Sequence, residues 1–328
     1  MGFLQETISN LKESKMNKRR EFLKATGALA AGSLILPYGC TSKKKPSDSE
    51  EIIVQPEKKN IGLQLYTLRN EIEAEGIVPV LEKVAKLGYT WMEGFKYEDR
   101  KILGLAPSEL KKVLNDLGMT MPSVHAVTEV SSDGGKDAVI KQMAESAEDV
   151  KAVGAEYLIW AFLQPDDRKS IEDYKRHIIT WNQFGKICKD NGLQFAYHNH
   201  DFEFLTPDGI NAYDMIMENS DPEEVKFEID LFWITMAGYD PVEYFEKAPG
   251  RFPLWHVKDK IEQPFISEDG EERYFAEVGN GVIDFARIFE ARETAGLEYF
   301  FVEQDFTQKT PFESIEISIN YLNNADFV

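Results

Sequence analysis

The stretch LQFAYHNH, residues 193–200, reads as a buried strand that follows a helix and ends in two histidines. Gly192 stands just before it, where helices commonly end in a glycine. Side chains alternate between the two faces of a strand, so His198 and His200 share one face. Two neighbouring imidazoles on a buried face cost free energy unless a metal, a carboxylate or a substrate satisfies them. The stretch therefore predicts a helix–strand unit with a polar site at the end of its strand; a pair of hydrogen-bonded structural histidines is the alternative.

The same alternation of helix and strand repeats along the chain from residue 61. Short apolar runs are separated by amphipathic segments such as 76–88, 106–118 and 283–296. The apolar runs are residues 61–67, 89–95, 119–127, 156–162, 193–200, 225–233, 253–259 and 298–305. Five helical segments end in a glycine, namely Gly88, Gly118, Gly154, Gly192 and Gly296. Eight strand–helix units in about 265 residues are the period of a TIM barrel, so we predict an α/β fold in which residues 61–328 form one (β/α)8 barrel. A doubly wound open sheet is the alternative, disfavoured because no glycine-rich phosphate loop follows the first strand.

The chain carries a formal net charge of −20, and its positive residues concentrate near the N-terminus. The first 60 residues hold 11 lysines and arginines against seven acidic residues, so the rest of the chain is more negative still. A surface of this sign repels nucleic acid and anionic lipid. We therefore expect a small-molecule substrate and no nucleic-acid partner. The sequence does not determine the oligomeric state, and it is compatible with an oligomer.

Residues 1–40 read as an export signal. Arg19 and Arg20 precede an apolar run, residues 25–36, that is shorter than the roughly 20 residues a membrane-spanning helix needs. The segment resembles a twin-arginine signal, and Cys40 resembles the acceptor cysteine of a lipoprotein. Met16 is a candidate for the true start of the chain. Residues 41–60 read as a flexible tether. We expect export by the twin-arginine route and retention at the cell envelope, on the periplasmic side, through a lipid anchor at Cys40.

Polar residues recur where the expected barrel strands end, and a TIM barrel carries its chemistry at that end. Four of the five histidines belong to this set, which consists of Glu93, His125, His198, His200, Asp230, His256 and Glu303. Because these residues come from different strands, the barrel brings them to one place. The set therefore predicts an active site; a buried ion-pair network of Asp230, His256 and Glu303 is the alternative.

With these residues in view, the chain from about residue 60 resembles the sugar phosphate isomerase/epimerase family of the xylose isomerase-like TIM-barrel superfamily. The resemblance rests on the motifs GLQLYTLR (62–69), YHNHDFEF (197–204), FEIDLFW (227–233), LWHVKD (254–259), EVGNGVIDF (277–285) and FVEQD (301–305). It implies one divalent metal, Mn²⁺, with Asp230, His256 and Glu303 as three ligands. Where the family commonly reads Glu-Asn-His, this chain reads His-Asn-His at 198–200. We take His198 as the fourth ligand, with Glu203 or water as alternatives. Two imidazoles and two carboxylates also suit Zn²⁺, Co²⁺ and Fe²⁺.

The remaining candidate residues surround this metal set. We expect Glu93, His125, Trp233 and Lys258 to contact the substrate, with Glu93 and His125 paired at the rim. Lys258 also stands among the candidate catalytic residues, and His200, Glu203 and Glu303 are the candidates for the general base. The segment 259–281 is long for a connection between strand and helix, and it is a candidate lid.

The resemblance and the residues together predict a metal-dependent sugar isomerase or epimerase that removes a proton next to a carbonyl held by the metal. A lyase or hydratase acting on a keto-sugar or a 3-keto-glycoside is the alternative, because it shares the first step. A second alternative is a non-catalytic sugar-binding lipoprotein of the envelope.

Overall fold

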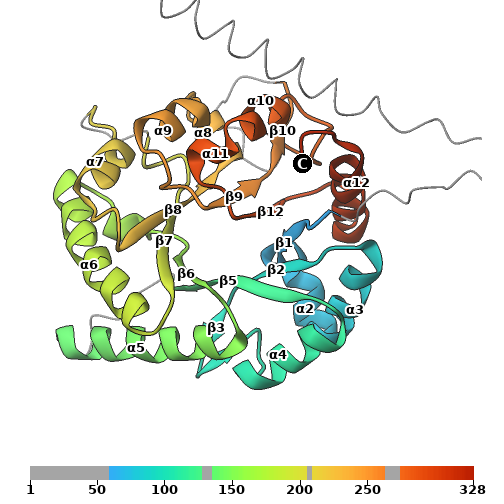
Figure 1. The fold of residues 1–328 in the computed structure, drawn as a ribbon, viewed down its shortest axis with the longest axis horizontal. Coiled ribbons are helices and arrows are strands. Elements are labelled where there is room, and N and C mark those ends of the chain that lie inside the picture. Colours follow the sequence, from blue (N-terminus) through green and yellow to red (C-terminus); the bar gives the residue numbers. More distant parts are fainter. Residues whose placement is uncertain (1–58, 128–134, 205–208, 263–273) are drawn as a thin grey trace, which may run out of the picture. The chain divides into compact units, whose positions relative to one another are not determined.

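Eight parallel strands close into a barrel, with helices around the outside (Figure 1). β1 pairs with both β2 and β12, which closes the ring. The barrel strands are β1 (Gly62–Gln64), β2 (Trp91–Gly94), β5 (Thr120–Val127), β6 (Tyr157–Trp160), β7 (Gln194–His198), β8 (Val225–Asp230), β9 (Leu254–Val257) and β12 (Tyr299–Val302). The predicted (β/α)8 barrel is confirmed.

This computed structural model describes residues 59–127, 135–204, 209–262 and 274–328. The expected export signal, the start at Met16, Cys40 and all but the last two residues of the expected tether lie outside these ranges, as do residues 263–273 of the candidate lid. Within the described ranges, no helix combines the length and the apolar character that crossing a membrane requires.

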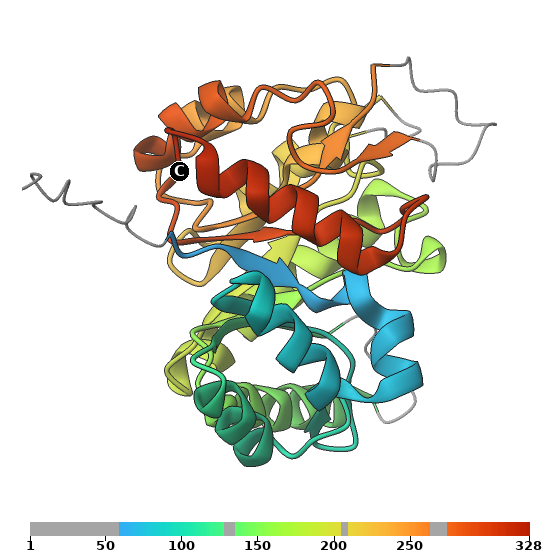
Figure 2. The same cartoon turned by 90° about the vertical axis from the view of Figure 1, so that its right-hand side faces the viewer.

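Helices follow the strands in the expected order. The longer ones are α3 (Ile77–Leu87), α4 (Pro107–Asp116), α5 (Gly135–Val153), α6 (Ile171–Asp190), α7 (Ala212–Asn219) and α12 (Pro311–Asn324). The shorter ones are η1 (Leu65–Leu68), α2 (Arg69–Glu75), η3 (Pro165–Asp167), α8 (Leu231–Met236), α9 (Pro241–Lys247), α10 (Phe285–Glu290) and α11 (Arg292–Ala295). All five glycines expected to end helices have φ between 70° and 105°, a region that favours glycine. Figure 2 shows the last helix, α12, beside the start of the barrel, where it contacts α3 and η1.

Two small antiparallel sheets lie outside the barrel. One pairs β3 (Tyr97–Glu98) with β4 (Lys101–Ile102) in the connection after β2. The other pairs β10 (Asp259–Lys260) with β11 (Phe275–Ala276) after β9. Both therefore belong to connections that leave the C-terminal ends of barrel strands, where a TIM barrel builds its site.

The barrel interior divides into an apolar half and a polar half. Tyr157, Ile159, Ala196, Leu254 and Phe301 form a separate buried cluster from the inward-facing positions of their strands. The next inward positions toward the C-terminal ends are polar, for example His198 two residues after Ala196 and His256 two residues after Leu254. Apolar side chains thus fill the barrel below, and the site sits on top of them.

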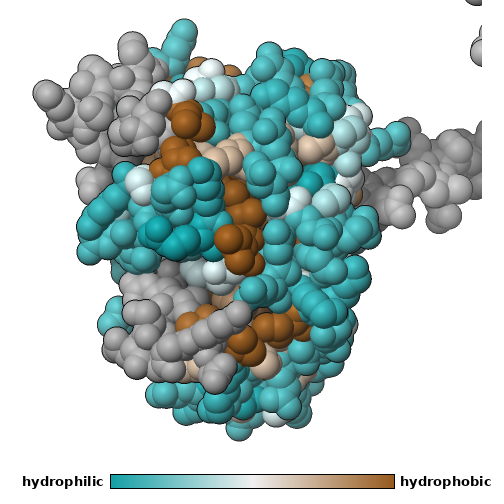
Figure 3. All heavy atoms as spheres, turned by 90° about the vertical axis from the view of Figure 1, so that its left-hand side faces the viewer, coloured by the Kyte–Doolittle hydropathy of each residue, from teal (hydrophilic) through white to brown (hydrophobic). Residues whose placement is uncertain are grey.

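The face that carries α6 and α7 is mostly hydrophilic, with hydrophobic atoms confined to a narrow, broken strip (Figure 3). Ile179 of α6, 61% exposed, is the most exposed large apolar side chain among those that the structure describes. A single exposed apolar side chain of this kind is ordinary on a folded protein.

Candidate active site

Asp230, His256 and Glu303 converge at the C-terminal ends of β8, β9 and β12. The Nδ1 atom of His256 lies 3.7 Å from Oδ2 of Asp230 and 2.8 Å from Oε2 of Glu303. Oδ1 of Asp230 accepts hydrogen bonds from the backbone N–H groups of Phe232 and Trp233 at 2.9 and 3.0 Å, because Asp230 caps α8. The cap fixes the carboxylate and leaves Oδ2 facing the other two side chains.

His198, expected as the fourth ligand, lies beside this set but belongs to a second buried group, with His125, Glu228 and His256. Its Nε2 atom lies 3.8 Å from Oδ2 of Asp230. Donor atoms that share one ion lie about 3–4 Å apart, since metal–ligand bonds to nitrogen and oxygen are near 2 Å. Oδ2 of Asp230 and Nδ1 of His256 are buried and in contact with charged neighbours: Nζ of Lys258 lies 2.9 Å from the first atom, and Oε2 of Glu303 lies 2.8 Å from the second. Imidazole and carboxylate atoms gathered at such distances fit a divalent transition metal, which would replace these contacts.

Glu93 orients the imidazole of His256 from below. Its Oε2 atom lies 2.5 Å from Nε2 of His256, and a carboxylate only accepts, so Nε2 carries a hydrogen and Nδ1 faces Asp230 and Glu303. Burial alone would lower the pKa of His256, but the surrounding carboxylates outweigh it and hold the pKa well above its usual range, so a metal on Nδ1 would replace a proton. Gln64 donates to the same oxygen at 2.8 Å, and the hydroxyl of Ser123 donates to Oε1. Burial alone would raise the pKa of Glu93, but His125 and His256 outweigh it and hold the pKa well below its usual range.

Glu228 and His125 extend this polar floor. Nε2 of His125 lies 2.6 Å from Oε2 of Glu228 and 3.3 Å from Oε2 of Glu93. Burial alone would lower the pKa of His125, but the two carboxylates outweigh it and raise the pKa to about 9. Glu228 Oε2 also lies 3.2 Å from Nδ1 of His198 and 3.3 Å from Nε2 of His256, so it faces three histidines of the site. We did not predict Glu228, although a strand period of two from Asp230 would have placed it on the same face.

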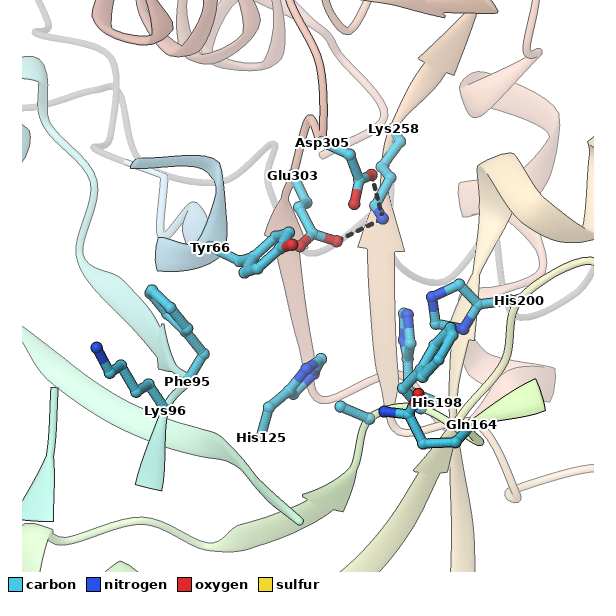
Figure 4. Close-up of a pocket in the computed structure, with 12 residues that line it drawn as sticks. Tyr66, Phe95, Lys96, His125, Gln164, His198, His200, Lys258, Glu303 and Asp305 are labelled. Atoms are coloured by element: carbon cyan, nitrogen blue, oxygen red, sulfur yellow. Dashed lines mark hydrogen bonds and ion pairs between the residues drawn. The ribbon is translucent and has the colours of Figure 1, made fainter. Parts of the chain in front are cut away.

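Lys258 supplies a buried positive charge. Its Nζ lies 2.5 Å from Oε2 of Glu303 and 2.9 Å from Oδ2 of Asp305 (Figure 4). The same atom lies 2.9 Å from Oδ2 of Asp230. Burial alone would lower the pKa of Lys258, but these carboxylates outweigh it and hold the pKa well above its usual range. Lys258 is therefore an ammonium at neutral pH. Asp305 is a second residue that sequence reasoning missed, and its spacing of two from Glu303 was the available signal.

Lys258, Glu303 and Asp305 line a cavity of about 540 Å³, within the range of small-molecule sites. Asp230 and His256 are fully buried and do not line it. His198 and His200 line one side of it, and Tyr66, Phe95 and Lys96 lie on the opposite side (Figure 4). His125 lies below them in the same view. The predicted residues His125, His198, His200, Lys258 and Glu303 all line this cavity.

His200 presents a neutral imidazole to the cavity. Its ring stacks on Phe202, with centroids 5.3 Å apart, and meets the edge of Phe162 at 5.0 Å. Burial, and after it the charge of Lys258, lower the pKa of His200 to about 3. An imidazole that is neutral at pH 7 has a lone pair with which it can take a proton.

Trp233, expected to contact the substrate, is 4% exposed and lies behind His200, with ring centroids 5.6 Å apart. It does not line the cavity that the other site residues share. Its ring lies 5.9 Å from Nζ of Lys258, so Trp233 packs beneath two residues that do face the cavity.

Glu203 lies outside the site. It accepts a hydrogen bond from the hydroxyl of Tyr197 and another, at 2.9 Å, from the backbone N–H of His200. Tyr197 points out of the barrel and stacks on Trp181 of α6 at 4.2 Å. The structure therefore places Glu203 behind β7. From this position it does not reach the cavity, so it fits neither of its two expected roles, the general base and the alternative metal ligand. Burial raises the pKa of Glu203 to about 8.

Glu93 is also deeper than expected. It is fully buried and does not line the cavity, although the expected contact with His125 is present at 3.3 Å. The expected rim position is wrong: Glu93 lies beneath His256. It belongs to strand β2 itself, which lies deeper in the barrel than the loops that form the cavity wall.

Asp259 anchors the described end of the candidate lid. Its carboxylate accepts four backbone N–H groups, from Lys260, Gly279, Gly281 and Ile283. An added Cβ at Gly281 would lie 2.2 Å from Oδ1 of Asp259, so the close approach requires glycine. This carboxylate serves the turn rather than the cavity.

The family model of the xylose isomerase-like TIM barrel matches residues 81–324. The chain belongs to this family. The crystal structure of a sugar phosphate isomerase/epimerase from Parabacteroides distasonis is similar, with a TM-score of 0.70 and 28% identity over 85% of this chain and 99% of that one. A crystal structure of the IolI protein with a zinc atom has a TM-score of 0.61 and 17% identity over 82% of this chain and 98% of that one, a likeness that shows the fold.

Among curated proteins, the inosose dehydratase of Geobacillus thermodenitrificans is 30% identical over 165 residues, which are 45% of this chain and 54% of that enzyme. This chain therefore spans about half the length of the curated relative that it matches. Both an isomerase/epimerase and a dehydratase are thus among the proteins that it resembles.

Proposed function

We propose that this protein is a divalent-metal-dependent sugar isomerase or epimerase that removes a proton from the carbon next to a carbonyl. The observation that carries the proposal is the set of Asp230, His256 and Glu303, three buried side chains whose ligand atoms all lie within 4.8 Å of one another. A divalent ion bound there, Mn²⁺ or alternatively Zn²⁺, Co²⁺ or Fe²⁺, supplies Lewis-acid stabilisation of the negative charge that develops on a carbonyl oxygen.

The chain's own residues supply the proton transfer. His200 and Glu303 face the cavity from β7 and β12, strands that β8 and β9 separate in the barrel, so two groups able to move a proton lie on different sides of a bound substrate. Removing the α proton leaves its electron pair in an enediolate. Return of a proton to the other face gives the epimer, and return to the neighbouring carbon gives the isomer.

Lys258 and His125 stabilise the same intermediate. Both line the cavity, and their pKa values, well above the usual range for Lys258 and about 9 for His125, keep them cationic at pH 7. Fixed positive groups in a buried site favour the state in which negative charge appears.

A lyase or hydratase acting on a keto-sugar is the second candidate, favoured by the 30% identity to an inosose dehydratase. It shares the removal of the α proton. The C–O bond at the β carbon then breaks, its electron pair leaves with the oxygen, and that oxygen takes a proton to depart as water or an alcohol. His200, once it holds the abstracted proton, or Lys258 would supply it.

Turnover in D₂O tests the proposal. Keto-sugars and 3-keto-glycosides are incubated with the metal-loaded protein, and deuterium at the α carbon is followed by NMR and mass spectrometry. Exchange without loss of atoms supports the isomerase or epimerase, whereas exchange with release of water or an alcohol and an unsaturated ketone supports the lyase. Asp230→Asn is the matched control, since it keeps the cap of α8 but weakens the ligand set. Sugar binding without exchange or turnover would support the remaining alternative, a non-catalytic sugar-binding protein.

We also propose that the protein reaches the cell envelope by the twin-arginine route and is held there by a lipid on Cys40. Paired Arg19 and Arg20 before a short apolar run, and a cysteine at its end, support this location.

A further inference from the structure

A second cavity adjoins the site. Its volume is about 440 Å³, and it lies between α2 and the β3–β4 hairpin. Tyr66, Phe95 and Lys96 line both this cavity and the catalytic one, so the two share a wall. Each cavity by itself falls within the range of small-molecule sites. No metal ligand of the proposed function faces the second cavity.

The shared wall is aromatic and fixed. Tyr66 and Phe95 meet edge to face with centroids 5.4 Å apart, and Tyr66 is 38% exposed. Arg69 holds Tyr66 in place: its guanidinium lies 4.3 Å from the ring centroid and donates to the backbone carbonyls of Tyr66 and Asp305 at 3.1 and 2.8 Å. An exposed aromatic face of this kind packs against the C–H face of a sugar ring.

The hairpin on the far side of the second cavity is equally well anchored. The Tyr97 hydroxyl donates to Asp149 of α5 at 2.6 Å, and Arg100 pairs with Asp149 and with Glu148 at 2.7 Å. Lys96, at the start of the hairpin, adopts φ of 58°, a left-handed conformation that a lysine rarely takes. Strain of this kind persists where surrounding contacts determine it, and it is common at ligand sites.

The lining of the second cavity is polar and mixed in charge. Asn70, Glu73 and Lys101 line it and do not line the catalytic cavity. Three acidic and three basic residues line it, so it has no single sign that would select a phosphate or a carboxylate. Amide, carboxylate and ammonium groups in one lining match a neutral partner with many hydroxyls, each of which both donates and accepts hydrogen bonds.

We infer that the substrate extends across the Tyr66–Phe95 wall, with its keto-sugar ring in the catalytic cavity and a second sugar ring in the cavity between α2 and the hairpin. The substrate class is thus a glycoside with two sugar rings rather than a free monosaccharide. This inference rests on the proposed function, because only that function places the keto group over Asp230, His256 and Glu303.

Asn70→Trp fills the second cavity from an exposed position on α2 and leaves the metal set untouched. Asn115→Trp, the same change at an exposed position on α4 away from both cavities, is the control. The substrates are 3-keto-glucose and a 3-keto-disaccharide of two glucose units. We expect the wild type and Asn115→Trp to favour the disaccharide at least tenfold in kcat/KM, and Asn70→Trp to remove this preference while kcat/KM for 3-keto-glucose stays within twofold.

Equal kcat/KM of the wild type for the two substrates, or an equal loss for both in Asn70→Trp, overturns the inference while the proposed function stands. If neither substrate turns over, the proposed function fails, and the binding of the non-reacting sugars cellobiose and glucose decides the subsite by calorimetry. Tighter binding of cellobiose that Asn70→Trp abolishes supports the second ring position; equal binding of both sugars overturns it.

Discussion

Nε2 of His256 lies 2.5 Å from Oε2 of Glu93, although the two residues are 163 positions apart in the chain. The contact places a hydrogen on Nε2 of His256 and turns Nδ1 toward Asp230 and Glu303. A buried carboxylate beneath a histidine is the arrangement that prepares an imidazole to bind a metal. The site therefore depends on residues that never meet the substrate.

The metal set predicts a loss of metal in specific variants. We expect about one transition-metal ion per purified chain and less than a tenth of that content in Asp230→Ala and His256→Ala, because each change removes a buried donor atom. Elemental analysis after dialysis measures the content, and circular dichroism checks the fold. Full metal content in both variants would contradict the set. Two ions per chain would implicate the cluster of His125, His198, Glu228 and His256 as well.

The contact between Glu93 and His256 predicts a weaker metal site in Glu93→Gln. The amide keeps the shape but removes the charge that favours the hydrogen on Nε2, so metal affinity should fall roughly 10- to 100-fold. Competition with a chelating dye gives the affinity. Ser123→Ala, which removes only a hydroxyl donor to Glu93, is the matched control and should change affinity less. Unaltered affinity in a folded Glu93→Gln would show that Glu93 acts on the fold alone.

The cavity geometry separates the two candidate bases on β7 and its loop. His200→Ala should suppress α-proton exchange in D₂O by about 10²-fold or more while the metal content stays, because His200 lines the cavity. Glu203→Gln should keep exchange within a few-fold of wild type, since Glu203 lies behind the strand. Loss of metal in His200→Ala would make His200 the ligand and free His198 for catalysis. Exchange at the wild-type rate in His200→Ala would leave Glu303 as the base.

The buried carboxyl of Glu203 predicts a pH dependence of stability. Burial raises its pKa to about 8 from an ordinary value of 4.5, so the folded protein binds this proton more tightly than the unfolded chain does. The contribution of Glu203 to the free energy of unfolding is therefore highest below pH 4.5 and falls as the pH rises to about 8. Relative to Glu203→Gln, which cannot ionise, the wild type should lose up to about 5 kcal/mol across this window. Urea unfolding at pH 5, 6.5 and 8 measures it, and parallel pH profiles would contradict the burial of a protonated carboxyl.

The proposed location predicts two separable effects. Replacing Arg19 and Arg20 together by lysine should keep the protein out of the periplasm, since the twin-arginine route requires the pair. Cys40→Ala should release the protein from membranes into the soluble periplasmic fraction. Cell fractionation and immunoblotting follow both. Export of the double lysine variant would assign the apolar run to the general secretory route, and membrane retention of Cys40→Ala would rule out the lipid anchor.

The sequence by itself determined the barrel and five of the twelve residues that line its cavity. The signals were local: a period of two within each strand, an apolar run of limited length, and a glycine where each helix ends. The parallel barrel then brings the ends of distant strands to one place, which is why the chain's own pattern groups His125, His198, His256, Asp230 and Glu303. The same period of two around Asp230 and Glu303 also held Glu228 and Asp305, which we did not predict.

Only the tertiary structure decided the depth and direction of side chains. Glu203 points outward and contacts Tyr197, and Glu93 lies beneath His256. The path of a loop and the depth at which a strand ends both depend on packing across the whole barrel. Lys258 found three carboxylates from β8 and from the segment after β12, a grouping with no counterpart in chain spacing. The second cavity likewise depends on the positions of α2 and the β3–β4 hairpin, which line its two sides. Apart from Glu203, whose partners are near it in the chain, these features rest on contacts between residues far apart in the chain, and such contacts exist only once the barrel has closed.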